Sequence, residues 1–88
     1  MDDNFVWVGN KAFMNYITAV VIQFTSLNQD EVIIKARGKF ISRAVDVSEV
    51  ITKRFLRECV YLKDIFIGSQ RFEGPNGEIR VSFRDYPG

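Results

Sequence analysis

The sequence has no histidine and only one cysteine, Cys59. Histidine is the commonest general base near neutral pH and a frequent metal ligand, so its absence removes the usual basis for acid–base catalysis or metal binding. A single cysteine excludes a disulfide within the chain and suits a reducing compartment. The sequence also has no phosphate-loop motif and no defensible pairing of a serine with a base. We therefore predict a protein that is not an enzyme and binds no cofactor and no metal.

Net charge is also nearly absent, at +1 for the whole chain, so bulk electrostatics do not by themselves indicate nucleic-acid binding. A length of 88 residues suits one domain, which we place over residues 1–88. The acidic start predicts that no signal peptide is present. The apolar stretch near residues 12–24 is interrupted by polar side chains and is shorter than the roughly 20 residues that a membrane-spanning helix needs. We therefore expect a cytoplasmic protein.

Apolar patterning predicts four strands and two helices. The predicted strands cover residues 5–8, 31–37, 60–72 and 79–83, and the predicted helices cover residues 12–27 and about 41–56. The first strand is a near-continuous apolar run, which is typical of a strand buried on both faces. The first helix is rich in β-branched residues, but its length and its narrow polar stripe favour a helix over a strand.

The resulting order, βαβαββ, predicts an α/β fold of the α+β sandwich type. We expect a mixed four-stranded sheet with two helices, parallel pairing in the first half, and a long antiparallel β-hairpin arm at the end. Asn10 is a good candidate for the N-cap of the first helix. The run Gly74-Pro75-Asn76-Gly77 has strong turn chemistry and is predicted to connect the two hairpin strands.

The most distinctive feature is a group of cations where the second strand meets the second helix. Lys35, Arg37, Lys39 and Arg43 lie there, and no acidic residue occurs from residue 32 to residue 45. Alternation places Lys35 and Arg37 on the same side of the strand. These cations are either a phosphate-contacting surface or ordinary solvated charges, and charge pattern alone favours the second reading.

Two other stretches carry weaker signals for phosphate or groove binding. The Gly9-Asn10-Lys11 turn could offer backbone N–H groups and a cation to a phosphate, but a plain helix-entry turn is the better explanation of this stretch by itself. The hairpin presents Arg71, Arg80 and Arg84, and an arm of this kind can enter a DNA groove. Glu73 and Glu78 reduce its positive potential, so an ordinary surface hairpin fits the same pattern.

Several motifs in the correct order resemble the Alba family of archaeal chromatin proteins. The clearest is IKARG at residues 34–38 followed by ISRAVD at residues 41–46. Further matching stretches lie at residues 8–11, 14–16, 54–56, 65–70, 75–77 and 80–82. The resemblance covers nearly the whole chain and implies the same βαβαββ fold. It also implies a homodimer that binds double-stranded DNA, and often RNA, with little sequence preference, as part of the archaeal nucleoid and chromosome.

The resemblance also implies roles for individual residues. Phosphate contacts would come from Lys11 in the loop before the first helix, from Arg37 and Lys39 in the cationic turn, and from Arg43. Arg71 and Arg80 would belong to hairpin arms that reach the minor groove. Phe55 would lie in an apolar patch that joins dimers side by side along DNA.

Some positions depart from the family pattern. Asn10 and Ala12 stand in a loop that usually reads Gly-Lys-Lys-Pro, so one central cation is lost. Phe40 replaces a residue that is usually small, the apolar ending is replaced by a polar one, and the chain is close to neutral. Because each phosphate contact contributes to affinity, these departures leave two alternatives open. One is an RNA-binding protein of RNA metabolism, and the other is a non-catalytic assembly protein with weakened nucleic-acid binding.

Overall fold

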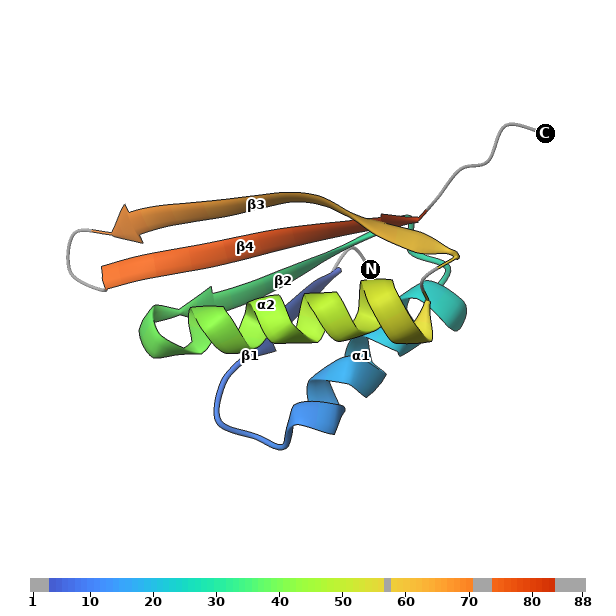
Figure 1. Cartoon of the computed structure of the whole chain (residues 1–88), viewed down its shortest axis with the longest axis horizontal. Coiled ribbons are helices and arrows are strands. Elements are labelled where there is room, and N and C mark those ends of the chain that lie inside the picture. The colour runs from blue at the N-terminus through green and yellow to red at the C-terminus, as the bar shows by residue number, and fades with distance from the viewer. Residues whose placement is uncertain (1–3, 57, 71–73, 84–88) are drawn as a thin grey trace.

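The computed structural model of the chain describes residues 4–56, 58–70 and 74–83. The strands are β1 (Phe5–Val8), β2 (Glu31–Arg37), β3 (Val60–Gln70) and β4 (Gly74–Phe83). The helices are α1 (Phe13–Thr25) and α2 (Ile41–Val50), which a 3₁₀ turn η1 (Gly38–Phe40) precedes and a π-helical turn η2 (Ile51–Phe55) continues. The predicted order βαβαββ is thus confirmed (Figure 1).

The sheet is mixed and four-stranded, in the order β1-β2-β4-β3. β1 and β2 run parallel, with Val8 opposite Ala36. β4 is antiparallel to both β2 and β3. The predicted mixed sheet and hairpin are therefore confirmed. β4 is an inner strand, and β3 lies at the edge of the sheet.

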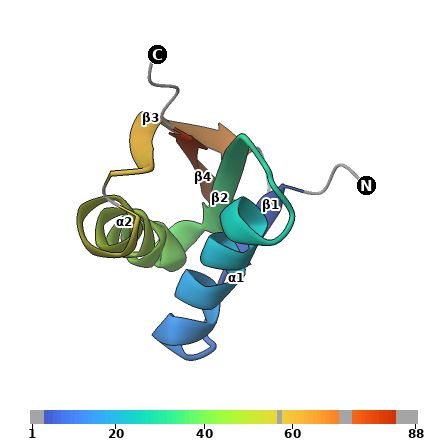
Figure 2. The ribbon, with the colours of Figure 1, turned by 90° about the vertical axis from the view of Figure 1, so that its right-hand side faces the viewer.

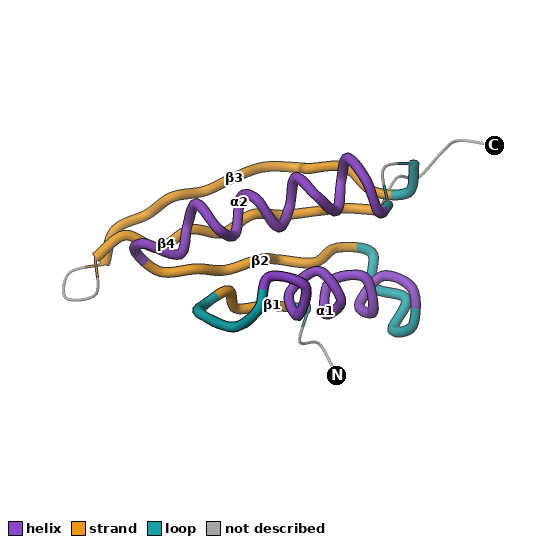
Figure 3. The backbone as a smooth tube through the Cα atoms, turned by 60° about the horizontal axis from the view of Figure 1, so that its bottom comes forward, coloured by secondary structure: helices purple, strands orange, loops and turns teal. Residues whose placement is uncertain are grey.

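Both helices cover the same face of the sheet (Figure 2). α1 lies over β1 and β2, and α2 lies over β2 and β4 (Figure 3). The strand residues that fill the core alternate along each strand, as a sheet covered on one face requires. They include Val6, Val8, Val32, Ile34, Ala36, Val60, Ile79 and Val81. We call the opposite, uncovered side the open face.

The β-branched segment predicted as a helix is helical. Its buried residues, Tyr16, Ile17, Val20 and Phe24, recur at the spacing of one helical face. Packing of that face against β1 and β2 outweighs the local preference of its β-branched residues for extended structure. Among the described residues, no helix is long and apolar enough to cross a membrane.

The prediction that β1 is buried on both faces is wrong. Val6 and Val8 are buried, but Phe5 is 40% exposed and Trp7 is 53% exposed. β1 is an edge strand, and its second face lies on the open side of the sheet. A short apolar run cannot reveal whether a second layer covers that side, which is why the sequence misled here.

The predicted turn at residues 74–77 is also wrong, because those residues belong to β4. Asn76 pairs with Arg37 of β2 and with Gly68 of β3, and the connection falls on residues 71–73, outside the described residues. Gly77 is needed for close packing and not for a turn, since a Cβ there would lie 3.2 Å from the side chain of Ile41. Pro75 lies beyond the end of β2, where a strand tolerates proline.

Glycine is conformationally required at the end of β2. Gly38 has a φ of +50°, a left-handed conformation that residues with a Cβ adopt at a cost. This sharp bend lets the extended chain of β2 enter the helical segment directly, so Arg37 and Lys39 flank the point at which the backbone turns.

Candidate nucleic-acid interface

The loops that carry the predicted cations meet at one end of the molecule. Because β1 and β2 are parallel and Val8 pairs with Ala36, the loop after β1 and the turn after β2 leave the sheet at the same edge. The pairing of Arg37 with Asn76 brings the part of the hairpin next to its connection to that edge as well. Figure 1 shows the loop, the turn and the hairpin at this end. We call it the cationic end, defined by Lys11, Arg37, Lys39 and Arg43.

Tyr16 holds the loop that carries Lys11. Its hydroxyl oxygen accepts hydrogen bonds from the backbone N–H of Gly9 at 3.0 Å and of Lys11 at 2.9 Å. These two N–H groups are therefore engaged within the chain, and the idea that they face a phosphate is wrong. The role predicted for Asn10 is also wrong, because Ala12 occupies the N-cap position of α1.

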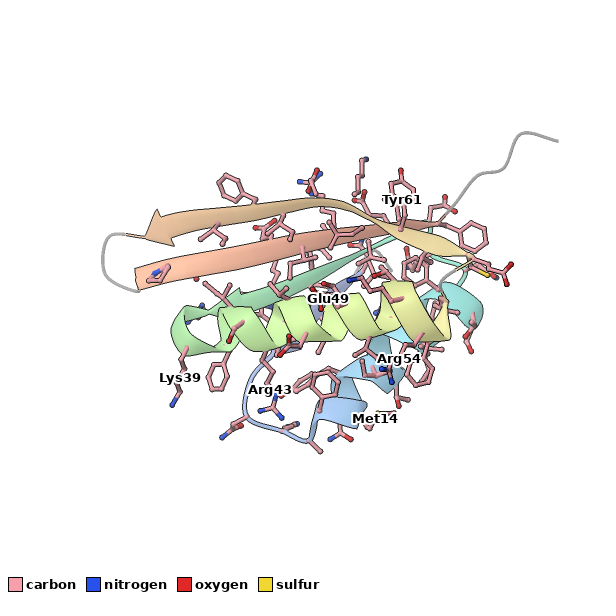
Figure 4. The ribbon with its side chains drawn as sticks, in the orientation of Figure 1. Met14, Lys39, Arg43, Glu49, Arg54 and Tyr61 are labelled. Atoms are coloured by element: carbon pink, nitrogen blue, oxygen red, sulfur yellow. The ribbon has the colours of Figure 1, made fainter. Side chains whose placement is uncertain are left out.

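Arg43 reinforces the same loop from α2. Its Nη1 donates to the carbonyl oxygen of Gly9 at 3.4 Å, and its guanidinium carbon lies 5.9 Å from the centre of the Tyr16 ring. Arg43 is half-buried, and Figure 4 shows it pointing from α2 toward the loop. Arg43 therefore positions the loop of Lys11 in addition to supplying a positive charge at its edge.

Lys11 and Lys39 are both exposed, and Figure 4 shows Lys39 at this end of the molecule. The Nζ atom of Lys39 lies 5.4 Å from the centre of the Phe40 ring, within the range of a cation–π contact. Phe40 itself is half-buried and packs against the core. The bulky residue in the turn therefore anchors η1 to the body of the protein and leaves Lys39 at the surface.

Lys35 and Arg37 lie together on the open face, as the alternation of β2 predicts. The Nζ atom of Lys35 is 4.1 Å from the centre of the Phe5 ring and 3.9 Å from a carboxylate oxygen of Glu78. The guanidinium of Arg37 lies 5.4 Å from the centre of the Trp7 ring. The open face thus carries aromatic rings with cations beside them.

The remaining predicted residues lie away from this group. Arg80 is on the open face of the inner strand β4, where its Nε is 3.8 Å from a carboxylate oxygen of Asp64. Phe55 is 52% exposed in η2, which follows α2 at the end remote from Lys39. Arg71 lies outside the described residues. The structure therefore brings four of the predicted cations together and places Arg80 and Phe55 elsewhere.

Sequence reasoning missed Trp7 and Tyr16. The alternation of Phe5 and Trp7 with two valines, next to a strand with Lys35 and Arg37 on one side, is the signal that could have revealed an open aromatic face. Tyr16 carried no comparable signal, because its hydrogen bonds to the loop depend on how α1 folds back toward β1.

Comparison with known proteins places this geometry in a family. A family model described as Alba matches residues 4–69. The chain belongs to the Alba family. It is 57% identical over 81 residues to the DNA/RNA-binding protein Alba of Methanococcus maripaludis, covering 91% of this chain and 90% of that protein. It is 51% identical over 82 residues to DNA/RNA-binding protein Alba 1 of Archaeoglobus fulgidus, covering 93% and 90%.

A solved structure supports the same assignment. Alba from Thermoplasma volcanium superposes with a TM-score of 0.77 at 38% identity, and the match covers 89% of this chain and 98% of that one. The family resemblance drawn from the IKARG and ISRAVD motifs is therefore confirmed, and so is the fold that it implied.

The geometry of this Alba domain predicts that Tyr16→Phe loosens the loop before α1. The substitution keeps the buried ring but removes the acceptor for two N–H groups. Since the loop is partly exposed, water can replace the lost bonds, and we expect a loss of about 1 kcal/mol in the free energy of unfolding. Urea unfolding measures this loss, and amide exchange is expected to accelerate most at Gly9 and Lys11. Unchanged exchange at both amides, relative to Val20 inside α1, would contradict this role.

Proposed function

We propose that this chain is a sequence-tolerant nucleic-acid-binding protein that acts in the archaeal nucleoid on double-stranded DNA. Its phosphate contacts come from Lys11, Arg37, Lys39 and Arg43. The observation that carries the proposal is the convergence of these four cations at the end where β1, β2 and the hairpin meet. The names of the relatives, DNA/RNA-binding protein Alba, support the same class of ligand.

Local charge matters more than the net charge of +1 for such binding. Screening limits exposed charges to a range of about 8–10 Å at physiological salt, so a phosphate at the cationic end is held by the nearby lysines and arginines. Contacts of this kind hold the backbone and do not read base sequence.

The hairpin supplies the second part of the proposed interface. Arg71 and Arg80 are the cations proposed to approach the minor groove. Arg80 is paired with Asp64 at 3.8 Å, and both side chains are exposed. A surface ion pair of this kind contributes only about 0–1 kcal/mol, so a phosphate or groove can displace Asp64 from Arg80 at little cost.

We also propose that the chain is a homodimer that pairs through β3. β3 is an edge strand, and its Ile65, Phe66 and Ile67 are 44%, 65% and 59% exposed. Register places Ile65 on the helix side and Phe66 on the open face. An apolar edge exposed on both faces favours association with another chain, and a second copy would bury it while bringing two cationic ends into one assembly.

A salt titration tests the nucleic-acid proposal. The logarithm of the association constant for an arbitrary DNA duplex is expected to fall steeply and linearly with the logarithm of salt concentration. Lys11→Ala and Lys39→Ala should each reduce the slope by about 0.9 for every phosphate contact removed. Lys53→Ala is the matched control, because Lys53 is an exposed lysine in η2, remote from the cationic end.

Two results of that titration would contradict the proposal: a flat salt dependence, or equal losses for Lys53→Ala and Lys11→Ala. The same series on a structured RNA decides between the DNA role and the alternative role in RNA metabolism. Binding unaffected by either Lys11→Ala or Lys39→Ala would instead favour an assembly protein with a weakened interface.

The dimer proposal predicts that Phe66→Asp separates the subunits. A carboxylate placed in an apolar interface must be desolvated, so the dimer dissociation constant should rise at least about tenfold, which corresponds to about 1.4 kcal/mol. Sedimentation equilibrium measures the constant. Leu27→Asp is the control, because Leu27 is 57% exposed in the loop after α1. A wild-type monomer, or a Phe66→Asp variant that still dimerises normally, would rule out this interface.

Phe55 is proposed to join neighbouring dimers on DNA. Its exposure of 52% means that Phe55→Ala removes little buried surface, so the stability of the dimer should change by less than about 1 kcal/mol. Assembly beyond a dimer on long duplexes, measured by sedimentation of the complexes, should decrease. Phe83→Ala, at 47% exposure on β4, serves as control. Equal assembly by both variants would show that Phe55 does not contribute to contacts between dimers.

A further inference from the structure

Trp7 is the only tryptophan in the chain, and the phosphate-binding role leaves it without a function. It is 53% exposed on the open face of the edge strand β1. A large exposed aromatic ring loses the stabilisation that burial would provide. Its surroundings therefore decide whether it is simply surface or part of a binding site.

Hollows lie on two sides of Trp7. One hollow of about 380 Å³ is lined by Trp7, Val8, Gly9, Arg37 and Phe40, and its size falls in the range of small-molecule sites. A smaller one of about 100 Å³ is lined by Trp7, Lys35, Ala36, Arg37, Asn76, Gly77 and Glu78. Trp7 and Arg37 border both hollows, so a ligand in either one meets an aromatic ring and a guanidinium.

The charges around the ring favour an anionic ligand. The Nζ atom of Lys35 and the guanidinium carbon of Arg37 lie 5.5 Å and 5.4 Å from the ring centre. Glu78 lies 3.9 Å from Lys35 and reduces the net charge there, whereas Lys39 in the turn after Arg37 is exposed. An anionic group is therefore best held between the ring and the cationic end.

A polar group beside the ring also lacks a partner. The side-chain Oδ1 of Asn76 is buried and has no hydrogen-bond partner among the described residues, and Asn76 lines the smaller hollow. A buried acceptor without a donor is costly, so a turn of the Asn76 side chain into the smaller hollow, where the N–H edge of a nucleobase can donate to it, costs no existing hydrogen bond of this oxygen. An aromatic ring, flanking cations and a polar group are what a nucleotide with a free base face requires.

We propose that Trp7, Arg37 and Asn76 form a binding site for an unpaired nucleotide of single-stranded nucleic acid. The base stacks on Trp7 and its phosphate lies against Arg37. In a duplex both faces of each base are already stacked on neighbours, so this site discriminates for single strands or for unpaired bases. The proposal extends the proposed function, since it adds a contact to bases beside the phosphate contacts of the cationic end.

The fluorescence of Trp7 reports this contact directly, because no other tryptophan contributes. Addition of an oligothymidine of about twelve nucleotides, within the length that one small domain covers, should quench the emission. Duplex DNA of the same length should quench it much less. No quenching at saturation by oligothymidine would overturn the proposal.

Substitutions at Trp7 distinguish stacking of a base on the ring from packing of the ring over Lys35 and Arg37. Trp7→Leu keeps an apolar cover over Lys35 and Arg37 but has no aromatic face. Fluorescence anisotropy of labelled oligothymidine should show affinity reduced about tenfold, since stacking of one base is worth about 1–3 kcal/mol. Affinity for labelled duplex should change less than about twofold, and Trp7→Phe should restore part of the single-strand affinity. Phe83→Ala, which removes an exposed ring elsewhere, should leave both unchanged.

Other outcomes have distinct meanings. If Trp7→Leu binds oligothymidine as tightly as the wild type, Trp7 only covers its neighbours and the site is overturned. If Trp7→Leu reduces the affinities for oligothymidine and for duplex equally, the loss of binding is general and the proposed site is again overturned. Failure of the proposed phosphate-binding function appears separately, as duplex binding by the wild type that does not depend on salt.

Discussion

The parallel pairing of β1 with β2 is the constraint on which the proposed binding surface depends. With Val8 opposite Ala36, two segments far apart in the sequence leave the sheet side by side. An antiparallel arrangement would send Lys11 and Arg37 to opposite ends of the molecule. The helix α1 between the strands makes the parallel pairing feasible, because parallel strands need a long crossover.

Tyr16 and Arg43 fix the conformation of the loop that carries Lys11. The Tyr16 hydroxyl binds two backbone N–H groups of the loop, and Arg43 binds a carbonyl of the same loop from α2. The loop is therefore attached to both helices before any ligand arrives. A surface organised in advance loses less conformational entropy on binding. This saving offsets part of the affinity that is lost because residue 10 is an asparagine and not a lysine.

The order of the elements and much of the cationic end could be predicted from sequence. Apolar patterns located β2 at residues 31–37 and distinguished a helix from a strand at α1. Such patterns can be read from sequence because they depend on residues close together in the chain. The Gly38 turn and its flanking cations were visible for the same reason. Local patterns also suggested a phosphate surface, although the charge pattern alone did not decide it.

The errors came from contacts between distant residues. Residues 74–77 have the composition of a turn, but they belong to β4. Glycine is needed at position 77 because β4 packs closely against the side chain of Ile41 there. The exposure of Trp7 depends on the absence of a second layer over β1 within the described structure. The anchoring of the loop by Tyr16 replaces the cap expected from Asn10. In each case tertiary packing overrode a local preference.

Nucleic acid is proposed to bind at the end of the molecule where the parallel strands β1 and β2 finish. Chemical-shift mapping of the backbone amides during addition of a short DNA duplex tests it most directly. The largest shifts are expected at Lys11, Gly38 and Lys39, with small shifts in η2 near Lys53. The largest changes in η2, with the loop and the turn unaffected, would contradict it.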